Sequence, residues 1–226
     1  MSPILRNIPN ILTISRIVLA AVFFIFFFYA TKLENFSKEY STYYYLAALI
    51  CFFIASITDA LDGFLARKLN VISKFGKLYD PLADKVLIIL AFYCIYFYPF
   101  KYFSYSYDMI GFFSHNQISM IIMLILSRDF LITIFREKLK SKKVILKASY
   151  IAKAKTVIQL ACIHIYLINK VLIANNVWAT HIEGITFFPS YIPSYISNIV
   201  FLFEFLLIIT LLLSLWSAHK YIRKNI

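Results

Sequence analysis

Four aspartates lie close together in a chain that holds few acidic residues. Only 11 of its 226 residues are Asp or Glu, yet four of these lie between positions 59 and 84: Asp59, Asp62, Asp80 and Asp84. Converging carboxylates repel one another unless a proton or cation lies between them, and an all-oxygen ligand set favours hard ions such as Mg²⁺, Mn²⁺ or Ca²⁺ over zinc. This window therefore predicts a divalent-metal site. Four carboxylates suit a two-metal clamp of the kind that stabilises phosphoryl displacement, and one of them could also act as a general base.

The spacing of these residues predicts which elements position them. Asp59 and Asp62 are three residues apart at the end of an apolar segment, so they share one face of a helix. Asp80 precedes Pro81, and we predict that Asp80 caps the next helix, with Pro81 as its first residue and Asp84 one turn inside it. The four carboxylates then lie at one depth.

Small residues and an arginine separate the two aspartate pairs. The chain has four glycines, and two of them, Gly63 and Gly76, lie in this window. Together with Ala66 they would let a phosphorylated group approach the helix backbone closely. Arg67 can bind a phosphate through paired hydrogen bonds. The window therefore predicts a phosphate group beside the metal.

The composition of the whole chain is that of a membrane protein. Hydrophobic residues make up 62% and charged residues 15%, and the mean hydropathy is +0.77, whereas a soluble domain is about 45–50% apolar and about 25% charged. We therefore exclude a soluble globule and predict one all-α, polytopic membrane domain over residues 1–226. Six segments approach the roughly 17–25 residues that a membrane-spanning helix needs: about 10–31, 41–60, 82–100, 117–136, 150–174 and 196–218.

The distribution of positive charge predicts the orientation. All but four of the 23 Lys and Arg residues lie near the N-terminus, in segments 67–85 and 128–155, or in the C-terminal tail. We assign the four exceptions to loops on the opposite side: Lys32, Lys38, Lys101 and Lys170. By the positive-inside rule both termini and the aspartates are cytoplasmic. The same rule explains the net charge of +12 without a nucleic-acid partner, and we expect none.

The aspartate window resembles the signature of the CDP-alcohol phosphatidyltransferases. It reads Asp59-x-x-Asp62-Gly63-x-x-Ala66-Arg67, eight residues, then Gly76-x-x-x-Asp80-x-x-x-Asp84, with no departure at a fixed position. The resemblance implies a six-helix enzyme, usually a homodimer in a bacterial inner membrane, in which an alcohol attacks the β-phosphorus of a CDP-linked lipid and CMP leaves. It implies that all four aspartates bind Mg²⁺ or Mn²⁺, as two ions, and that Asp84 is also the base. The implied nucleotide and diphosphate pocket consists of Asp62, Gly63, Ala66, Arg67 and Gly76.

Further stretches resemble one branch of this family, the phosphatidylglycerophosphate synthases, which join sn-glycerol 3-phosphate to CDP-diacylglycerol. These stretches are Asn7–Thr13, Phe135–Glu137, Ala152–Thr156 and Leu215–Ser217. A phosphorylated acceptor carries about two negative charges and needs cations around it. We predict that these cations are Arg128, Arg136, Lys153 and Lys155. Arg128 is the best placed, because an unpaired guanidinium inside an apolar span is costly, whereas the other three can be snorkelling anchors at span ends.

Two alternatives remain at this stage. Ser127-Arg128-Asp129 resembles the corresponding stretch of the CDP-alcohol type of cardiolipin synthase, whose acceptor is phosphatidylglycerol. The glycerophosphate enzymes more often have Glu after this Arg. The role of Asp129 stays open. A cation transporter also uses membrane carboxylates, but its sites tend to lie near the midplane between two related halves, and this chain has no repeat. Three further polar residues are expected to form hydrogen bonds between helices: Gln159, His164 and Glu204.

Overall fold

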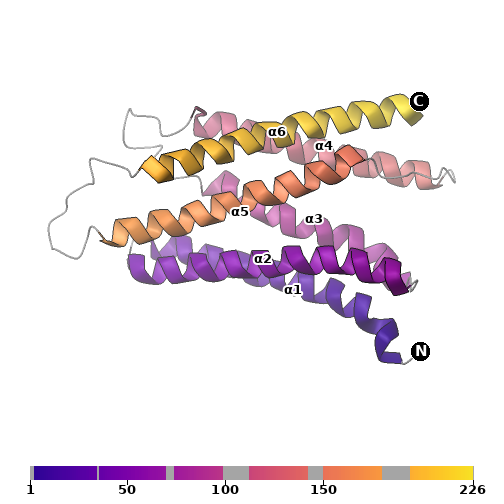
Figure 1. The fold of residues 1–226 in the computed structure, drawn as a ribbon, viewed down its shortest axis with the longest axis horizontal. Helices are drawn as coiled ribbons and strands as arrows, with labels where there is room; N and C mark the ends of the chain where they lie inside the picture. Colours follow the sequence, from indigo (N-terminus) through magenta and orange to yellow (C-terminus); the bar gives the residue numbers. More distant parts are fainter. Residues whose placement is uncertain are drawn as a thin grey trace. The chain divides into compact units, whose positions relative to one another are not determined.

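The computed structural model of the protein describes residues 3–34, 36–69, 74–98, 112–141, 150–179 and 194–225, which form six helices and no strand (Figure 1). The helices are α1 (Pro3–Leu33), α2 (Lys38–Leu69), α3 (Lys74–Phe97), α4 (His115–Ser141), α5 (Tyr150–Ala179) and α6 (Ser194–Asn225). Each of the six predicted apolar segments falls on one of these helices. The predicted all-α class is confirmed.

Five of the helices contain stretches that are long and apolar enough to cross a membrane. These stretches are Ile14–Leu33, Glu39–Thr58, His115–Phe135, Tyr150–Asn175 and Ser197–Tyr221. In α3 the apolar part that the structure describes is shorter, Lys85–Phe97. The chain is therefore a multi-pass integral membrane protein.

The start of α3 differs from the prediction. The helix begins at Lys74, so Pro81 lies inside it and Asp80 does not cap it. An Asp-Pro pair is typical of a helix start, because a proline inside a helix removes one backbone hydrogen bond and crowds the carbonyl four residues earlier, although its φ value suits a helix. Helices of membrane proteins tolerate such a proline. The residues from Lys74 to Tyr79 therefore extend α3 toward α2, and the predicted cap is wrong.

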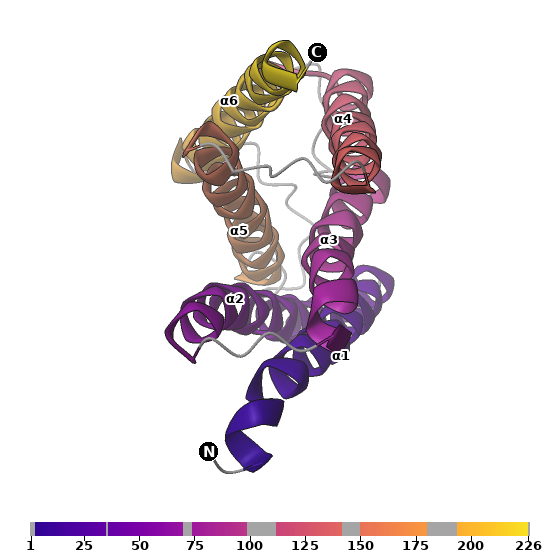
Figure 2. The ribbon, with the colours of Figure 1, turned by 90° about the vertical axis from the view of Figure 1, so that its right-hand side faces the viewer.

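The described helices form two compact groups. The first contains α1, α2, α3 and the C-terminal part of α5 from Leu167, and the second contains α4, α6 and the N-terminal part of α5 up to Tyr166. In the first group α1 contacts both α2 and α3 (Figure 2). The helix pair that carries the aspartate window is thus supported by α1.

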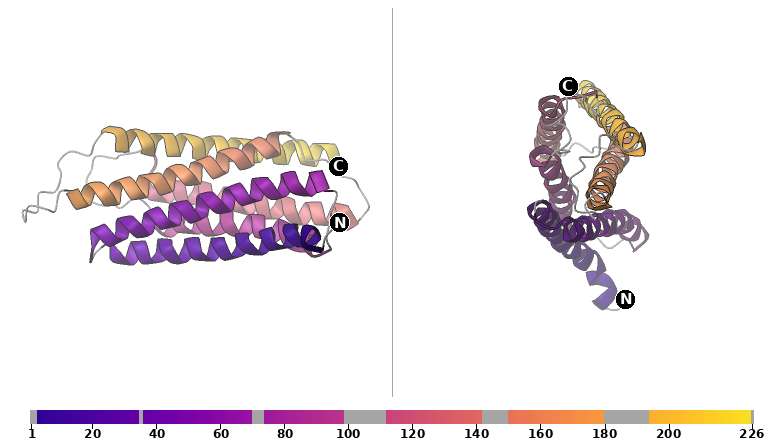
Figure 3. Two further views of the ribbon diagram at one scale, coloured as in Figure 1. Left: turned by 60° about the horizontal axis from the view of Figure 1, so that its bottom comes forward. Right: turned by 90° about the vertical axis from the view of Figure 1, so that its left-hand side faces the viewer.

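Alternating small and aromatic side chains hold α1 against α2, which run alongside each other in Figure 3. The fully buried residues recur at helical spacing and are Ala20, Phe23, Phe27 and Ala30 on α1, and Tyr45, Ala48, Phe52 and Ala55 on α2. The ring centroids of Phe23 and Phe52 are 5.4 Å apart, as are those of Phe27 and Tyr45. Small residues let the two backbones approach, and the aromatic rings fill the space between them.

The turn between α1 and α2 is tight and hydrogen-bonded. The backbone N–H groups of Phe36 and Ser37 both donate to the carbonyl of Leu33, each at 2.9 Å. The hydroxyl of Ser41 donates to the carbonyl of Ala30 at 3.0 Å, which ties the first turn of α2 to the last turn of α1. The two bonds to Leu33 satisfy a carbonyl group that the end of α1 would otherwise leave unpaired, whereas the Ala30 carbonyl also accepts from the Glu34 N–H at 3.1 Å.

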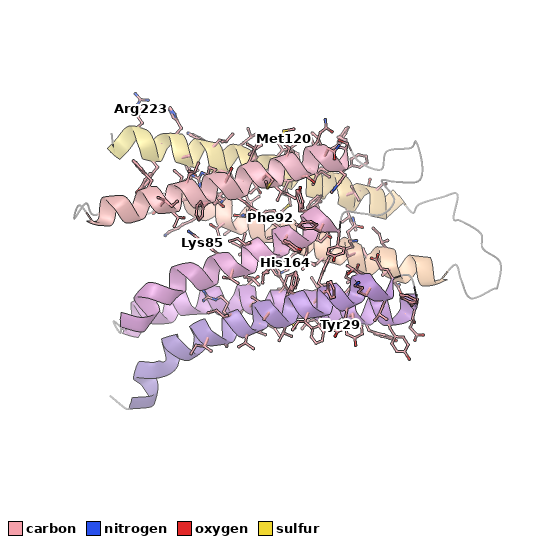
Figure 4. The ribbon with its side chains drawn as sticks, turned by 180° about the vertical axis from the view of Figure 1, so that it is seen from behind. Tyr29, Lys85, Phe92, Met120, His164 and Arg223 are labelled. Carbon is pink, nitrogen blue, oxygen red and sulfur yellow. The ribbon has the colours of Figure 1, made fainter. Side chains whose placement is uncertain are left out.

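Aromatic contacts also join α3 to α1. The ring centroids of Phe24 and Tyr93 are 5.7 Å apart, and those of Phe27 and Tyr98, the residue that follows α3, are 5.8 Å apart. Phe92, which is labelled in Figure 4, is fully buried in the same helix. These contacts fix the C-terminal half of α3, and its N-terminal half carries Asp80 and Asp84.

Lys170 lies in α5 and not in a loop, contrary to the prediction from charge. Its side chain is 4% exposed, with Nζ 3.7 Å from a carboxylate oxygen of Glu34 and 5.7 Å from the ring centroid of Tyr45. The Tyr45 hydroxyl donates to the same Glu34 oxygen. Because Glu34 compensates the charge, α5 continues past Lys170 as a helix. The lysine therefore attaches α5 to the α1–α2 turn.

In the second group a buried stripe on α6 faces its neighbours. The stripe repeats at three- and four-residue spacing and consists of Val200, Phe203, Leu207, Thr210, Ser214 and Ser217. The rings of Tyr166 on α5 and Phe203 are 5.9 Å apart, and α6 also contacts α4. The stripe becomes polar toward its C-terminal end, where it meets the charged residues described below.

Glu204 fixes the start of α4 from α6. Its buried carboxylate accepts hydrogen bonds from the backbone N–H of Phe112 at 2.7 Å and of Phe113 at 3.3 Å. Ser114 then caps α4, because its N–H donates to the side-chain oxygen of Gln117 and its hydroxyl accepts from the Gln117 N–H. Glu204 therefore does link separate segments by hydrogen bonds, as the sequence predicted.

Replacing Glu204 is expected to destabilise the protein without changing how its substrates bind. Glu204→Gln keeps one acceptor oxygen for two N–H donors, so we expect a loss of about 1–3 kcal/mol of unfolding free energy. Thermal unfolding in detergent measures this loss, with Phe205→Leu at an exposed neighbouring position as the control. An unchanged melting temperature in Glu204→Gln would contradict this role.

Candidate active site

The four aspartates of the signature lie at matched heights on α2 and α3, measured along the backbone. Asp62 is seven residues before the end of α2 at Leu69, which is about 10 Å along the helix. Asp80 is six residues after the start of α3 at Lys74, which is about 9 Å along the helix. Asp59 and Asp84 each lie about 15 Å from those ends. Four residues connect the two helices, so the ends are at most about 18 Å apart. Measured along each helix from these ends, Asp62 and Asp80 lie at similar distances, and so do Asp59 and Asp84.

The other signature residues lie nearer the same connection. Gly63, Ala66 and Arg67 are in the last two turns of α2, and Gly76 is the third residue of α3. For these residues and the four aspartates the structure describes the helical backbone alone. Their helical positions agree with the predicted grouping, and their roles as ligands or substrate contacts stay predictions.

The donor chemistry of this window fits a hard divalent ion. Its four acidic residues are all Asp, and each lies on a helix within about three turns of a short connection. Oxygen-only ligands of this kind suit Mg²⁺ or Mn²⁺. Among the side chains that the structure does describe, no group of three His, Cys, Asp or Glu offers a second metal site.

A charged cluster joins α4, α5 and α6 in the second group of helices. The Arg128 guanidinium donates through Nη1 to Asp129 Oδ1 at 2.9 Å and through Nη2 to the hydroxyl of Ser217. Lys155 Nζ donates to the other carboxylate oxygen of Asp129. Two of the four predicted acceptor-binding cations are therefore brought together, and one carboxylate contacts both.

Burial makes this cluster electrostatically significant. The side chains of Arg128, Asp129 and Lys155 are 15%, 24% and 8% exposed. These cations lie in a poorly solvated place, where charge-assisted hydrogen bonds to an oxyanion are strong. The buried Nε of Arg128 has no hydrogen-bond partner in the described part of the chain. The cluster therefore keeps a buried donor for an anionic ligand.

Lys153 and Arg136 are not brought into this cluster by any described contact. The exposed Lys153 lies two residues from Lys155, about 200° around α5, and its Nζ is 5.8 Å from the ring centroid of Tyr150. This placement suits the alternative that the sequence left open, an anchor at a span end. Arg136 lies on α4, and its side chain is outside the described part of the structure.

The sequence did not assign the roles of Asp129 and Ser217. Asp129 was noted only as a departure after Arg128, and Ser217 only as part of a resembling stretch. A carboxylate next to an arginine within an apolar span was a usable signal, because each charge there needs a partner. The contact between Asp129 and Lys155 joins residues 26 positions apart, and that of Arg128 with Ser217 joins residues 89 apart. No local pattern predicts such contacts.

Comparison with known proteins decides the family. A family model described as CDP-alcohol phosphatidyltransferase matches residues 6–216, nearly the whole chain. This chain belongs to the CDP-alcohol phosphatidyltransferase family. The match includes the aspartate window on α2 and α3 and also Arg128, Asp129 and Lys155. The protein is therefore of a transferase family, and the transporter alternative loses its basis.

Relatives within the CDP-alcohol phosphatidyltransferases carry a more specific name. The chain is 34% identical over 166 residues to a protein of Rickettsia typhi, covering 74% of this chain and 79% of that one. It is 32% identical over 167 residues to a protein of Bacillus subtilis, with 73% and 78% covered, and 39% identical over 85 residues to one of Escherichia coli, with 38% and 41% covered. All three are named CDP-diacylglycerol–glycerol-3-phosphate 3-phosphatidyltransferase.

Proposed function

We propose that the protein transfers a phosphatidyl group from CDP-diacylglycerol to sn-glycerol 3-phosphate, giving phosphatidylglycerophosphate and CMP. The names of the similar bacterial proteins support both substrates. The observation that supports the choice of acceptor is the cluster of Arg128, Asp129 and Lys155, in which two poorly exposed cations lie against one carboxylate; such cations suit a phosphate monoester.

In this proposal a hydroxyl of glycerol 3-phosphate attacks the β-phosphorus of CDP-diacylglycerol. A new P–O bond forms to the acceptor oxygen, the bond to the CMP oxygen breaks, and CMP leaves with the bonding electrons. Asp84 accepts the hydroxyl proton. Arg67 and the close backbone at Gly63, Ala66 and Gly76 hold the nucleotide and diphosphate.

The carboxylates of Asp59, Asp62, Asp80 and Asp84 would hold Mg²⁺ or Mn²⁺, as two ions. When bound, these ions supply Lewis-acid stabilisation of the charge on the diphosphate. Arg128 and Lys155 would bind the acceptor through its phosphate, which leaves its hydroxyl free to react. Arg136 and Lys153 stay candidates for the same phosphate, Lys153 only if its exposed side chain turns away from Tyr150.

The topology is part of the same proposal. We infer six spans, namely the five long apolar helices and α3. The described apolar part of α3 is short because the N-terminal half of this helix is polar and carries Asp80 and Asp84. By the positive-inside rule, the basic segments support a topology with both termini and the active site on the cytoplasmic side, and the bacterial relatives support a bacterial inner membrane. A homodimer is expected from the family, with lipid around the exposed apolar faces.

A parallel acceptor assay tests the proposed function. The purified chain in detergent receives CDP-diacylglycerol and Mg²⁺ or Mn²⁺, with glycerol 3-phosphate, phosphatidylglycerol, inositol phosphate or serine, and CMP release is measured. We expect release with glycerol 3-phosphate alone. Release only with phosphatidylglycerol would instead identify a cardiolipin synthase, the alternative that Ser127-Arg128-Asp129 suggested, and silence with every acceptor from a folded sample would reject the proposed substrates.

Arg128→Ala is expected to raise the KM for glycerol 3-phosphate by about 10- to 100-fold, because a charge-assisted contact contributes about 1.5–3 kcal/mol. The KM for CDP-diacylglycerol should change little. Arg128→Lys keeps the charge but cannot contact Asp129 and Ser217 together, so an intermediate value is expected. Arg223→Ala, at an exposed position near the end of α6 (Figure 4), is the control. An unchanged acceptor KM in Arg128→Ala would remove Arg128 from the acceptor site.

A further inference from the structure

The carboxylate of Asp129 occupies a central place among the charges of the second helix group. One of its oxygens contacts Arg128 Nη1 and the other contacts Lys155 Nζ, so it bridges α4 to α5. Its backbone carbonyl accepts the Thr133 hydroxyl at 2.7 Å within α4. Asp129 is thus the one group, among the described residues, that contacts both cations.

Ser217 holds the guanidinium from the other side. Its hydroxyl donates to the Ser214 carbonyl at 3.1 Å, so the lone pairs of the same oxygen are available to the N–H of Arg128 Nη2. Ser217 is 5% exposed, and it lies on a buried helix face. The guanidinium plane is therefore fixed at two of its nitrogens, and Nε, the third, is buried with no partner in the described residues.

We infer that Asp129 is a positioning residue of the acceptor site, which holds Arg128 and Lys155 as a pair for the phosphate of a phosphorylated alcohol. This inference rests on the proposed function. Without a carboxylate between them, two cations that are 15% and 8% exposed repel each other, and the ligand would have to bring them together itself. Asp129 removes this cost before the acceptor arrives.

Two opposite roles for this carboxylate make different predictions. If Asp129 positions the cations, then removing its charge weakens phosphate binding. If Asp129 merely competes with the phosphate for the same cations, removing its charge raises the net charge of the cluster and strengthens binding. The sign of the change in the dissociation constant therefore separates the two roles.

We measure this dissociation constant by calorimetric titration of the full chain in detergent with sn-glycerol 3-phosphate. Mg²⁺ and CMP are present, and no turnover occurs. For Asp129→Asn we expect a dissociation constant raised by about tenfold or more. For Asp129→Glu, which keeps the charge but moves it by one methylene, we expect a rise of only a few fold. Glu34→Gln removes a carboxylate from the separate ion pair with Lys170 and should leave the constant unchanged.

An unchanged or lowered constant in Asp129→Asn overturns the inference, and so does an absence of binding to the parent chain. If Asp129→Asn does not fold, as judged by its size-exclusion profile, Asp129→Glu decides: a few-fold rise supports positioning and no change overturns it. CMP release is measured on the same samples. If glycerol 3-phosphate stimulates CMP release but the Asp129 variants leave its dissociation constant unchanged, the inference alone is rejected. If the Asp129 variants change the dissociation constant but glycerol 3-phosphate does not stimulate CMP release, the proposed function alone is rejected.

Discussion

Asp84→Asn is expected to lower CMP release by about 10²–10⁴-fold, the usual contribution of a positioned general base. The amide has nearly the shape of the carboxylate but cannot accept the proton of the attacking hydroxyl. Asp84 lies within α3 rather than at its end, so the substitution should leave the helix intact. Turnover is measured in detergent at saturating CDP-diacylglycerol and glycerol 3-phosphate, and nucleotide-lipid binding is measured separately.

A carboxylate elsewhere on the same helix pair controls for the loss of charge. Glu39 lies in the first turn of α2, exposed and far along the helix from Asp59. Glu39→Gln should therefore keep the parent rate. Near-normal turnover in Asp84→Asn would remove Asp84 as the base, and loss of lipid binding together with turnover would point to a ligand role alone.

Removing divalent ions with EDTA is expected to abolish CMP release, by more than about 100-fold, and added Mg²⁺ or Mn²⁺ should restore it. Four carboxylates on two neighbouring helices would otherwise repel one another and the diphosphate of the substrate. CMP release is measured before chelation, after it, and after each ion is returned. Calorimetry with the metal alone gives a second measurement that does not depend on turnover.

The aspartates themselves provide the matched variants for this prediction. Asp62→Ala should raise the Mg²⁺ concentration needed for half-maximal activity, because one oxygen ligand is lost, and Glu39→Gln should not. Full activity in a sample that elemental analysis shows to be free of divalent ions would exclude a metal requirement.

The helices were largely predictable because each follows from a long apolar run. Backbone groups in a membrane must pair within their own segment, so a run such as Ile14–Leu33 has few alternatives to a helix. The helix ends were less predictable. Asp80-Pro81 has the pattern of a helix start, yet α3 begins earlier, at Lys74, because helices of membrane proteins tolerate an internal proline that would be costly in an isolated helix.

The charged residues show where local reasoning stops. Lys170 was assigned to an outer loop when the positive charges were counted by side, but it is buried in α5, and its partner Glu34 is 136 positions away, so no local pattern could indicate the pair. Arg128 and Lys155 were selected for their charge and position; the structure brings both against Asp129, and their binding of the acceptor stays a prediction. Their link through Asp129 depends on how α4 and α5 are placed side by side, which the sequence of either helix does not state.

Contacts made by α6 have a consequence for how the protein is synthesised. The α1–α2 pair is held by residues close in sequence, from the Ser41 contact with Ala30 to the packed rings, so it can assemble while the ribosome is still translating the remaining helices. The hydroxyl that braces Arg128 comes from residue 217 of 226. The carboxylate that fixes the start of α4 is also on α6. Until α6 has entered the membrane, the chain therefore lacks the contacts that brace Arg128 in the proposed acceptor site and fix the start of α4.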